Sequence, residues 1–538
     1  MKLTFIGADH EVTGSEHLLE TKDLKILIDC GLEQGRNIYE NAKLPVSYGE
    51  LDYILLTHAH IDHAGRIPQA FLAGFRGTVL TTNASLDLDS IMLLDSAHIQ
   101  EQEAEWQNRK GRRAGKKPVE PLYTVQDAKA VLKNFRAVPY GRVVELSDTV
   151  KVRFTDAGHL LGSASIEIWI TEDGEKRKIV FSGDIGNTGK PLIRDPQYIA
   201  EADYVVMEST YGNRLHDRSL NHLEDLRRIL QETLDRGGNV VIPAFAVGRT
   251  QELLYLIRHL KQDRMIRGHE NFPVYVDSPL AVQATQVFRE NLLECYDEET
   301  RELVLRGINP IDFPNLHLSV SAEDSKAINF DEAPKVILAA SGMCDAGRIR
   351  HHLKHNLWRP ECSVVFAGYQ AEGTLGRVLL DGADTVRLFG EEIEVQAHIE
   401  VMGSMSSHAD QEGLLSWISA FQKKPIELFL VHGEDEAMTA LSALIEERLG
   451  YRPSCPYSGS EYDLLAGSYL YQAEPVFIKK EQKTAIRNNQ VKQELRQSLE
   501  ALARLSEDLL EGSNAEMKRL TGQIRALLRD WKQSENGV

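Results

Sequence analysis

The densest group of metal-binding side chains in the sequence is the segment Thr-His-Ala-His-Ile-Asp-His at residues 57–63. It directly follows the apolar run Tyr-Ile-Leu-Leu, which is typical of a buried strand. Imidazole and carboxylate ligands together suit zinc and similar borderline divalent metals. His58 and His60 share one face if the strand continues, whereas Asp62 and His63 enter a turn or helix start and can reach a second ion. The segment therefore predicts a metal centre at the carboxyl end of a strand.

A centre with two ions needs further ligands, because two adjacent metals take about eight ligands with some of them shared. Three later segments repeat one construction, in which a strand is followed by a short loop with histidine or aspartate. They supply His159, Asp184 and His432, and a carboxylate such as Asp184 can bridge two metals. Singly, each is more simply read as a core or loop residue. Their repeated placement favours one shared site.

These residues resemble the HxHxDH signature and the later ligands of the metallo-β-lactamase fold, a four-layer αββα sandwich with two metals at a sheet edge. The resemblance implies that His58, His60 and His159 hold one zinc, that Asp62, His63 and His432 hold the other, and that Asp184 bridges them. Asp29 matches the aspartate of the family's first motif, which supports the site from just outside the ligands. Manganese and iron also suit this nitrogen-and-oxygen ligand set.

Further motifs indicate which of the families with this fold the sequence resembles. The segments 207–212, 407–410 and 431–434 resemble motifs A, B and C of the β-CASP nucleases, and three segments between 243 and 348 also resemble that family. The pattern at 58–63 is closer to polyadenylation-factor-like endonucleases and their prokaryotic relatives than to ribonuclease J. In this family a histidine at motif C, here His432, accompanies RNA substrates. The resemblance implies a zinc-dependent ribonuclease for single-stranded RNA that leaves 5′-phosphate and 3′-hydroxyl ends, with an endonuclease favoured over a 5′-to-3′ exonuclease.

The expected catalytic residues are His408, Glu208 and the bridging Asp184. His408 would protonate the departing oxygen, and Glu208 would orient that imidazole and keep it charged. Two glycine-containing loops, 341–348 and 368–377, precede helical runs, where backbone N–H groups can hold a phosphate. Ordinary strand-to-helix turns explain the same loops. The expected substrate contacts are Ser341, Gly342, Arg348, Arg377 and Arg249.

The elements that would position these residues fall into four segments. Residues 1–210 alternate short β-branched runs with helical patterns, which indicates sheets covered by helices. Residues 211–395 alternate longer helices with strands, as in a parallel α/β domain, and the strand–loop–histidine texture returns at 396–475. The expected fold class is α/β (α+β): an αββα metallo-β-lactamase sandwich with an inserted parallel α/β β-CASP domain. Residues 476–538 predict a C-terminal helical hairpin, with Ser513 and Glu516 as a capping box, that packs on the body or on a second copy in a homodimer.

Composition restricts the remaining possibilities. The net charge of -19 argues against a surface coated for nonspecific nucleic-acid binding. The segment 109–117 is nevertheless strongly basic and is either a solvated loop or a phosphate-backbone contact near the metal site. No apolar stretch approaches the roughly 20 residues that span a bilayer. The five cysteines are scattered without a CxxC pair, which favours reduced thiols in a cytoplasmic protein.

Two other functions fit part of the pattern. A small-ester or thioester hydrolase would use the same metal site but leaves Glu208, His408 and the insertion unexplained. A noncatalytic RNA-binding scaffold would be expected to have lost metal ligands, whereas every expected ligand is present.

Overall fold

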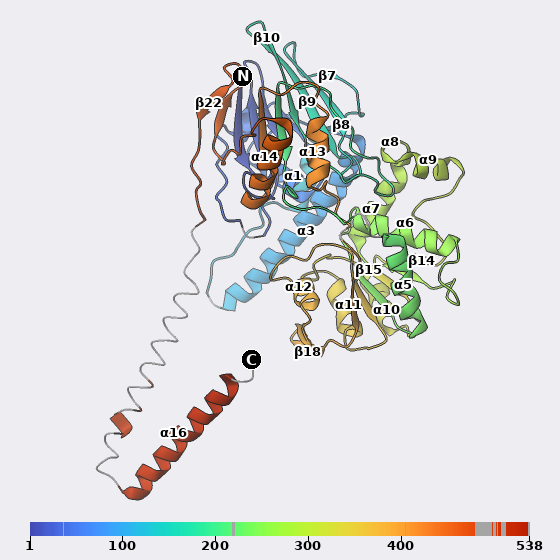
Figure 1. Cartoon of the computed structure of the whole chain (residues 1–538), viewed down its shortest axis with the longest axis vertical. Coiled ribbons are helices and arrows are strands. Elements are labelled where there is room, and N and C mark those ends of the chain that lie inside the picture. The colour runs from blue at the N-terminus through green and yellow to red at the C-terminus, as the bar shows by residue number, and fades with distance from the viewer. Residues whose placement is uncertain are drawn as a thin grey trace. The chain divides into compact units, whose positions relative to one another are not determined.

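The computed structural model describes residues 1–35, 37–113, 115–217, 221–403, 405–478, 498, 502, 504–506 and 513–535. The chain divides into two units, Met1–Val476 and Phe477–Val538, which are described separately. Figure 1 shows the elements of both.

The first sheet has eight strands in the order β22-β21-β1-β2-β3-β4-β5-β6. Its members are β1 (Lys2–Gly7), β2 (Glu16–Glu20), β3 (Lys25–Ile28), β4 (Tyr53–Leu55), β5 (Thr78–Thr81), β6 (Phe135–Ala137), β21 (Glu461–Asp463) and β22 (Ser468–Tyr471). The strands β3, β4, β5 and β6 pair in parallel, so their carboxyl ends lie at one edge of the sheet.

The second sheet has six strands in the order β20-β11-β10-β9-β8-β7. Its members are β7 (Val144–Glu145), β8 (Val150–Asp156), β9 (Ala164–Glu172), β10 (Glu175–Phe181), β11 (Tyr204–Glu208) and β20 (Glu427–Val431). The strands β10, β11 and β20 run parallel as neighbours, although more than 200 residues separate β11 from β20 in the sequence.

The two sheets pack face to face and are covered by helices on both outer sides. Phe5 and Ile28 of the first sheet share one apolar core with Phe154 and Phe429 of the second. The outer face of the first sheet is covered by α1 (Ile61–Ala64), α2 (Ile67–Leu72), α3 (Asn83–Arg113) and α4 (Val125–Val131), with the short 3₁₀ turns η1 (Tyr48–Glu50) and η2 (Leu132–Asn134). The outer face of the second is covered by α13 (Gln411–Ser419) and α14 (Asp435–Leu449), as Figure 1 shows. This is the expected αββα sandwich.

The insertion has its own parallel sheet, in the order β14-β13-β15-β12-β16-β19. Its strands are β12 (Val240–Pro243), β13 (Val274–Val276), β14 (Leu316–Leu318), β15 (Val336–Ala339), β16 (Ser363–Phe366) and β19 (His398–Val401). Its helices are α5 (His222–Asp235), α6 (Arg249–Gln262), α7 (Pro279–Glu290), α8 (Leu292–Cys295), α9 (Glu298–Leu305), α10 (Ala322–Phe330), α11 (Ile349–Asn356) and α12 (Leu375–Leu380), and β17 (Thr385–Leu388) pairs with β18 (Glu391–Glu394). Because β19 belongs to this sheet, the sheet of the insertion runs to Val401, beyond the boundary of 395 expected from the sequence.

The second unit contains α16 (Asn514–Glu535). The predicted capping box is present at its start, because the backbone N–H of Ser513 donates to Glu516 at 3.2 Å and that of Glu516 donates back to Ser513 Oγ at 3.4 Å. The first helix of the predicted hairpin falls mostly outside the described residues, so the hairpin and the homodimer remain predictions. Within the described part of the chain, no helix combines the length and the apolar character that a bilayer crossing requires.

Candidate metal centre

The strand ends of the sandwich bring the predicted ligands to one edge. Asp184 follows β10, Glu208 ends β11 and His432 follows β20. Because these strands are parallel neighbours, with Glu208 aligned on Val431, their carboxyl ends deliver three polar side chains side by side. His58 follows β4 of the facing sheet, and His159 lies in the loop after β8. Both sheets therefore contribute histidine or carboxylate side chains to this edge.

The segment after β4 turns into a helix within two residues of its first histidine. His60 is the N-cap of α1, so Asp62 and His63 lie on its first turn. This short helix packs tightly against the loop after β3: a Cβ on Gly31 would lie 1.7 Å from the carbonyl oxygen of Asp62. Only glycine fits there. The close approach of the two loops fixes where the helix begins and thereby where its ligands point.

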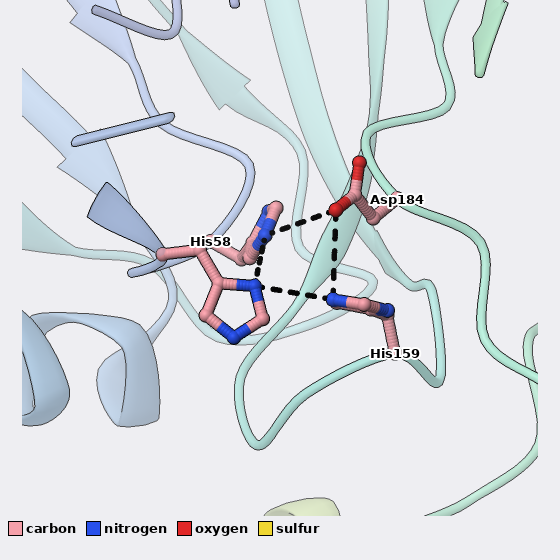
Figure 2. A group of neighbouring side chains, drawn as sticks. His58, His159 and Asp184 are labelled. Atoms are coloured by element: carbon pink, nitrogen blue, oxygen red, sulfur yellow. Dashed lines mark hydrogen bonds and ion pairs between the residues drawn. The ribbon is translucent and has the colours of Figure 1, made fainter. Parts of the chain in front are cut away.

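The side chains of His58, His60, His159 and Asp184 converge on a first point. Figure 2 labels His58, His159 and Asp184 of this group. The Nδ1 atom of His60 lies 3.1 Å from Nε2 of His58 and 3.2 Å from Nε2 of His159. The Oδ2 atom of Asp184 lies 3.4 Å from Nε2 of His58 and 3.5 Å from Nε2 of His159. Ligands about 2.05 Å from a tetrahedral zinc are about 3.3 Å apart, so the spacing fits one such ion.

A second group lies on the other side of the same aspartate. The Nε2 atoms of His63 and His432 are 3.3 Å apart, and Asp62 Oδ2 lies 3.7 Å from Nε2 of His432. The second oxygen of Asp184, Oδ1, lies 3.3 Å from His63 Nε2. This oxygen is buried and receives no hydrogen bond from the described residues, as expected of an atom that binds a cation. The donor set fits a divalent metal.

Burial keeps the imidazoles of the first group available as ligands. It lowers the pKa of His60 to about 3 and also lowers the pKa of His58 and His159. Neutral imidazole is the form that binds metal. His63 differs, since burial would lower its pKa but the charges of Asp184 and Asp29 outweigh this effect and raise it. A cation at Nε2 of His63 would take the place of that proton.

Asp29 lies directly behind His63, on the side away from the second group. Its Oδ2 is 2.7 Å from Nδ1 of His63, and its Oδ1 accepts a hydrogen bond of 2.8 Å from the backbone N–H of Thr57. Held in this way, His63 directs Nε2 toward the second group. Such partners fix the orientation of a metal-binding imidazole.

His408 and Glu208 form a pair beside the two groups. Nδ1 of His408 lies 3.2 Å from both carboxylate oxygens of Glu208, which is 1% exposed. The opposite ring atom, Nε2, lies 3.8 Å from Oδ2 of Asp184. Burial alone would lower the pKa of His408, but the charges of Glu208 and Asp184 outweigh it and raise the pKa to about 9. These charges favour the protonated imidazole, whose Nε2 faces Asp184.

Comparison with known proteins shows which family the chain belongs to. Family profiles match residues 15–72 (Metallo-beta-lactamase superfamily), 250–379 (Beta-Casp domain) and 392–456 (Zn-dependent metallo-hydrolase RNA specificity domain). Ribonuclease TTHA0252 of Thermus thermophilus is 38% identical over 452 residues, which cover 83% of this chain and 96% of that protein. The chain is a β-CASP nuclease of the metallo-β-lactamase superfamily.

Two further relatives agree with the placement among β-CASP nucleases. Transcription termination factor FttA of Methanocaldococcus jannaschii is 31% identical, with 81% of this chain and 67% of that protein covered. The RNase J-like protein of the same organism is 28% identical, with 85% of this chain and 98% of that protein covered. The resemblance seen in the sequence motifs is confirmed.

A cleft of about 690 Å³ opens beside the metal centre of this β-CASP nuclease. His60, Asp62 and His159 lie on its wall together with His408. The insertion supplies further lining residues, among them Ser341 and Gly342, which were expected to contact substrate. The two loops of the insertion also contact each other, since Gln370 Nε2 donates to the carbonyl of Gly342 at 3.0 Å.

The three arginines expected to contact substrate bind partners within the protein. Arg249 lines the cleft, but it pairs with Glu252 at 2.6 Å and donates to the carbonyl oxygen of Met405. Arg348 pairs with Asp277 at 2.7 Å. Arg377 pairs with Asp381 one helical turn away. Neither Arg348 nor Arg377 is among the described residues that line the cleft, so contact with substrate would require an exchange of partners.

Two threonines that hold the ligands were not predicted. Thr57 Oγ1 donates to Asp29 at 3.0 Å and lies 3.1 Å from Nδ1 of His58. Thr210 Oγ1 lies 3.1 Å from Nδ1 of His432. Both stand in segments already recognised as motifs. Their hydroxyls carried no signal of their own, because a threonine at a strand end is equally typical of a helix cap or a turn.

Proposed function

We propose that this protein is a ribonuclease that hydrolyses single-stranded RNA at a two-zinc centre. The observation that carries the proposal is the placement of Asp184 between two groups of metal-binding side chains, with the His408–Glu208 pair next to it. The RNA substrate is supported by the family profile for RNA specificity and by the names of the relatives, a ribonuclease among them.

The ligand assignment follows the two groups. One ion would be held by His58, His60 and His159, and the other by Asp62, His63 and His432. Asp184 would bind both ions. Two zinc ions held in this way would supply a water of lowered pKa and neutralise charge on a phosphate. Asp29 would keep His63 in the orientation that binds the metal. Ser341 and Gly342, which line the same cleft, would contact the RNA backbone.

His408 would act as the general acid of the reaction. Glu208 holds Nδ1, so the proton on Nε2 points toward the metal ligands, where the scissile phosphate would lie. As the P–O3′ bond breaks, the proton of His408 passes to the departing O3′ atom, while the oxygen of water forms the new bond to phosphorus and loses one proton to solvent, from which His408 is protonated again. The products are a 5′-phosphate and a 3′-hydroxyl. The raised pKa of His408 keeps it protonated at neutral pH.

Single-stranded RNA with a 5′ label and circular RNA test the proposal together. Zinc-loaded protein should cleave both, because an endonuclease needs no free end, and a chelator should abolish cleavage. His408→Ala should lose turnover but keep its zinc, whereas the control His269→Ala, which removes a surface histidine paired with Asp235, should cleave normally. Cleavage of linear RNA alone would replace the endonuclease by an exonuclease. Intact RNA at full zinc occupancy would refute the ribonuclease, and hydrolysis of a thioester by the same sample would favour the small-ester alternative.

A further inference from the structure

The helix α3 connects the metal centre with the basic segment 109–117. Near its start, Ser85 Oγ donates to the carbonyl of Gly162 at 2.9 Å, in the loop that carries His159. The helix then continues for 31 residues, which at 1.5 Å per residue is about 46 Å. Figure 1 shows its C-terminal half projecting beyond the sheets. The basic segment therefore lies at the far end of this helix, whereas one of the two readings of the sequence had placed it near the metal site.

One face of α3 continues outward from the cleft. Met92 and Ile99 line the cleft. Trp106 and Lys110 follow at intervals of seven and four residues, which keeps them on the same face of the helix. Ile99 is 48% exposed and Trp106 is 53% exposed, so both present apolar surface to solvent. An apolar stripe thus begins inside the cleft and ends at an exposed indole about 10 Å beyond it.

The outer end of this stripe carries strong positive charge in an acidic protein. Six lysines and arginines and no acidic residue lie between 106 and 117, whereas the whole chain has a net charge of -19. The Nζ atom of Lys110 lies 3.6 Å from the centre of the Trp106 ring. Aromatic side chains beside cations are the surfaces on which single-stranded nucleic acids stack their bases and place their phosphates. The surface of a second protein copy would instead be depleted of lysine.

We propose that the outer half of α3, from Ile99 to Arg113, together with Lys116 and Lys117 that follow it, is a second contact surface for single-stranded RNA that continues the catalytic cleft. RNA whose scissile bond lies at the metal centre would extend along α3, stack a base on Trp106 and place phosphates against the residues 109–117. The inference rests on the proposed function and adds to it a dependence on RNA length. One acidic residue, Glu103, lies on the same face and opposes RNA binding.

RNA of two lengths tests this surface. Trp106 lies about 30 Å along the helix from the turn that contacts the His159 loop, so a four-nucleotide RNA at the metal centre does not reach it, whereas a 20-nucleotide RNA does. Binding would be measured by fluorescence anisotropy on the full chain carrying His408→Ala, and cleavage on the otherwise unaltered chain. Trp106→Ala should weaken binding of the long RNA about tenfold, the loss of one stacked base, and leave the short RNA unchanged.

Charge variants give a second measurement of the same surface. Replacing Arg112 and Arg113 by Gln should flatten the salt dependence of binding by about 1.4 in log–log slope, since each phosphate contact on a single strand contributes about 0.7. Glu103→Gln should tighten binding of the long RNA. The matched controls are Trp358→Ala, an indole that is 55% exposed on the insertion, and Gln at the exposed residues Lys423 and Lys424; neither should change binding.

The outcomes separate this inference from the ribonuclease itself. Normal cleavage of both RNAs with unchanged long-RNA affinity and salt slope in all α3 variants would overturn the second surface. Equal losses for short and long RNA would also overturn it, because the residues would then act at the metal centre. If Trp106→Ala altered sedimentation and not RNA affinity, the surface would belong to a second copy of the chain. Failure of the unaltered chain to bind or cleave either RNA would refute the ribonuclease.

Discussion

Replacement of Glu208 by Gln tests the role of His408 most directly. Gln keeps the carbonyl oxygen that accepts a hydrogen bond of 2.6 Å from the backbone N–H of Ile185, so the loop geometry is preserved while the charge is lost. Both Glu208 oxygens lie 3.2 Å from Nδ1 of His408. A unit charge pair whose charge centres are about 4 Å apart contributes roughly 4 kcal/mol at an effective dielectric of 20, which is about a thousandfold in proton affinity.

The consequence is a shift in the pH dependence of cleavage. A general acid must be protonated, so activity is maintained below the pKa of His408, about 9, and falls as pH rises through it. In Glu208→Gln this alkaline limb should move down by about three pH units. The potential of bound metal acts on the pKa in both proteins, so it cancels in the comparison.

Single-turnover cleavage of labelled RNA between pH 5 and 10, with zinc content measured at each point, would show the shift. The control is Asp277→Asn, which removes the carboxylate of another buried pair, 2.6 Å from Nε2 of His352, and should leave the limb in place. An unmoved limb in Glu208→Gln at full zinc occupancy would refute the role assigned to Glu208.

Three further outcomes are expected. Asp29→Ala should weaken zinc binding 10–100-fold at the group that contains His63, measured by competition with a chromophoric chelator; two unchanged affinities would contradict this. Removing zinc should lower the melting temperature and adding it back should restore it, because the buried Asp184 then lacks cations; equal melting temperatures would contradict the proposed ligand set. Burial raises the pKa of Asp156 from 3.8 to about 7, so the folded state retains a proton that the unfolded state loses, and stability falls as pH rises through about 7. Asp156→Asn should flatten this dependence, up to about 4 kcal/mol, in urea unfolding at pH 4 to 8; an unchanged dependence would rule out Asp156 as its source.

The elements that hold the site were predictable where local signals were strong. The strands β3 and β5 can be predicted from the sequence, since each is a short apolar or β-branched run between turn residues. The strand β2 was missed because it contains only two apolar residues and its polar ones are buried by distant partners, as Glu16 is by Arg66 at 2.9 Å. The C-terminal end of α3 at Arg113 cannot be predicted from an apolar pattern, because the last turns of this helix are basic.

The arrangement of the site was predictable in its residue types and not in its contacts. The metal-binding side chains could be recognised in the sequence because histidine and aspartate follow several predicted strands in the same way. The partners of the arginines within the protein could not be recognised in the sequence. Asp277 and Arg348, for example, are 71 residues apart, and only the folded insertion brings them together. Contacts of this kind depend on the tertiary fold, which no local pattern encodes.

The pairing of β11 with β20 also determines at which stage of protein synthesis the proposed metal site can be completed. His432 is the last metal-binding residue to leave the ribosome, roughly 250 residues after Asp184, because the whole insertion is translated in between. At about 5–20 residues per second this interval is roughly 12–50 s. Throughout it the nascent chain holds an incomplete ligand set and an unpaired edge at β11. The position of the insertion in the sequence thus makes the proposed ligand set complete only late in synthesis, after β20 has been translated.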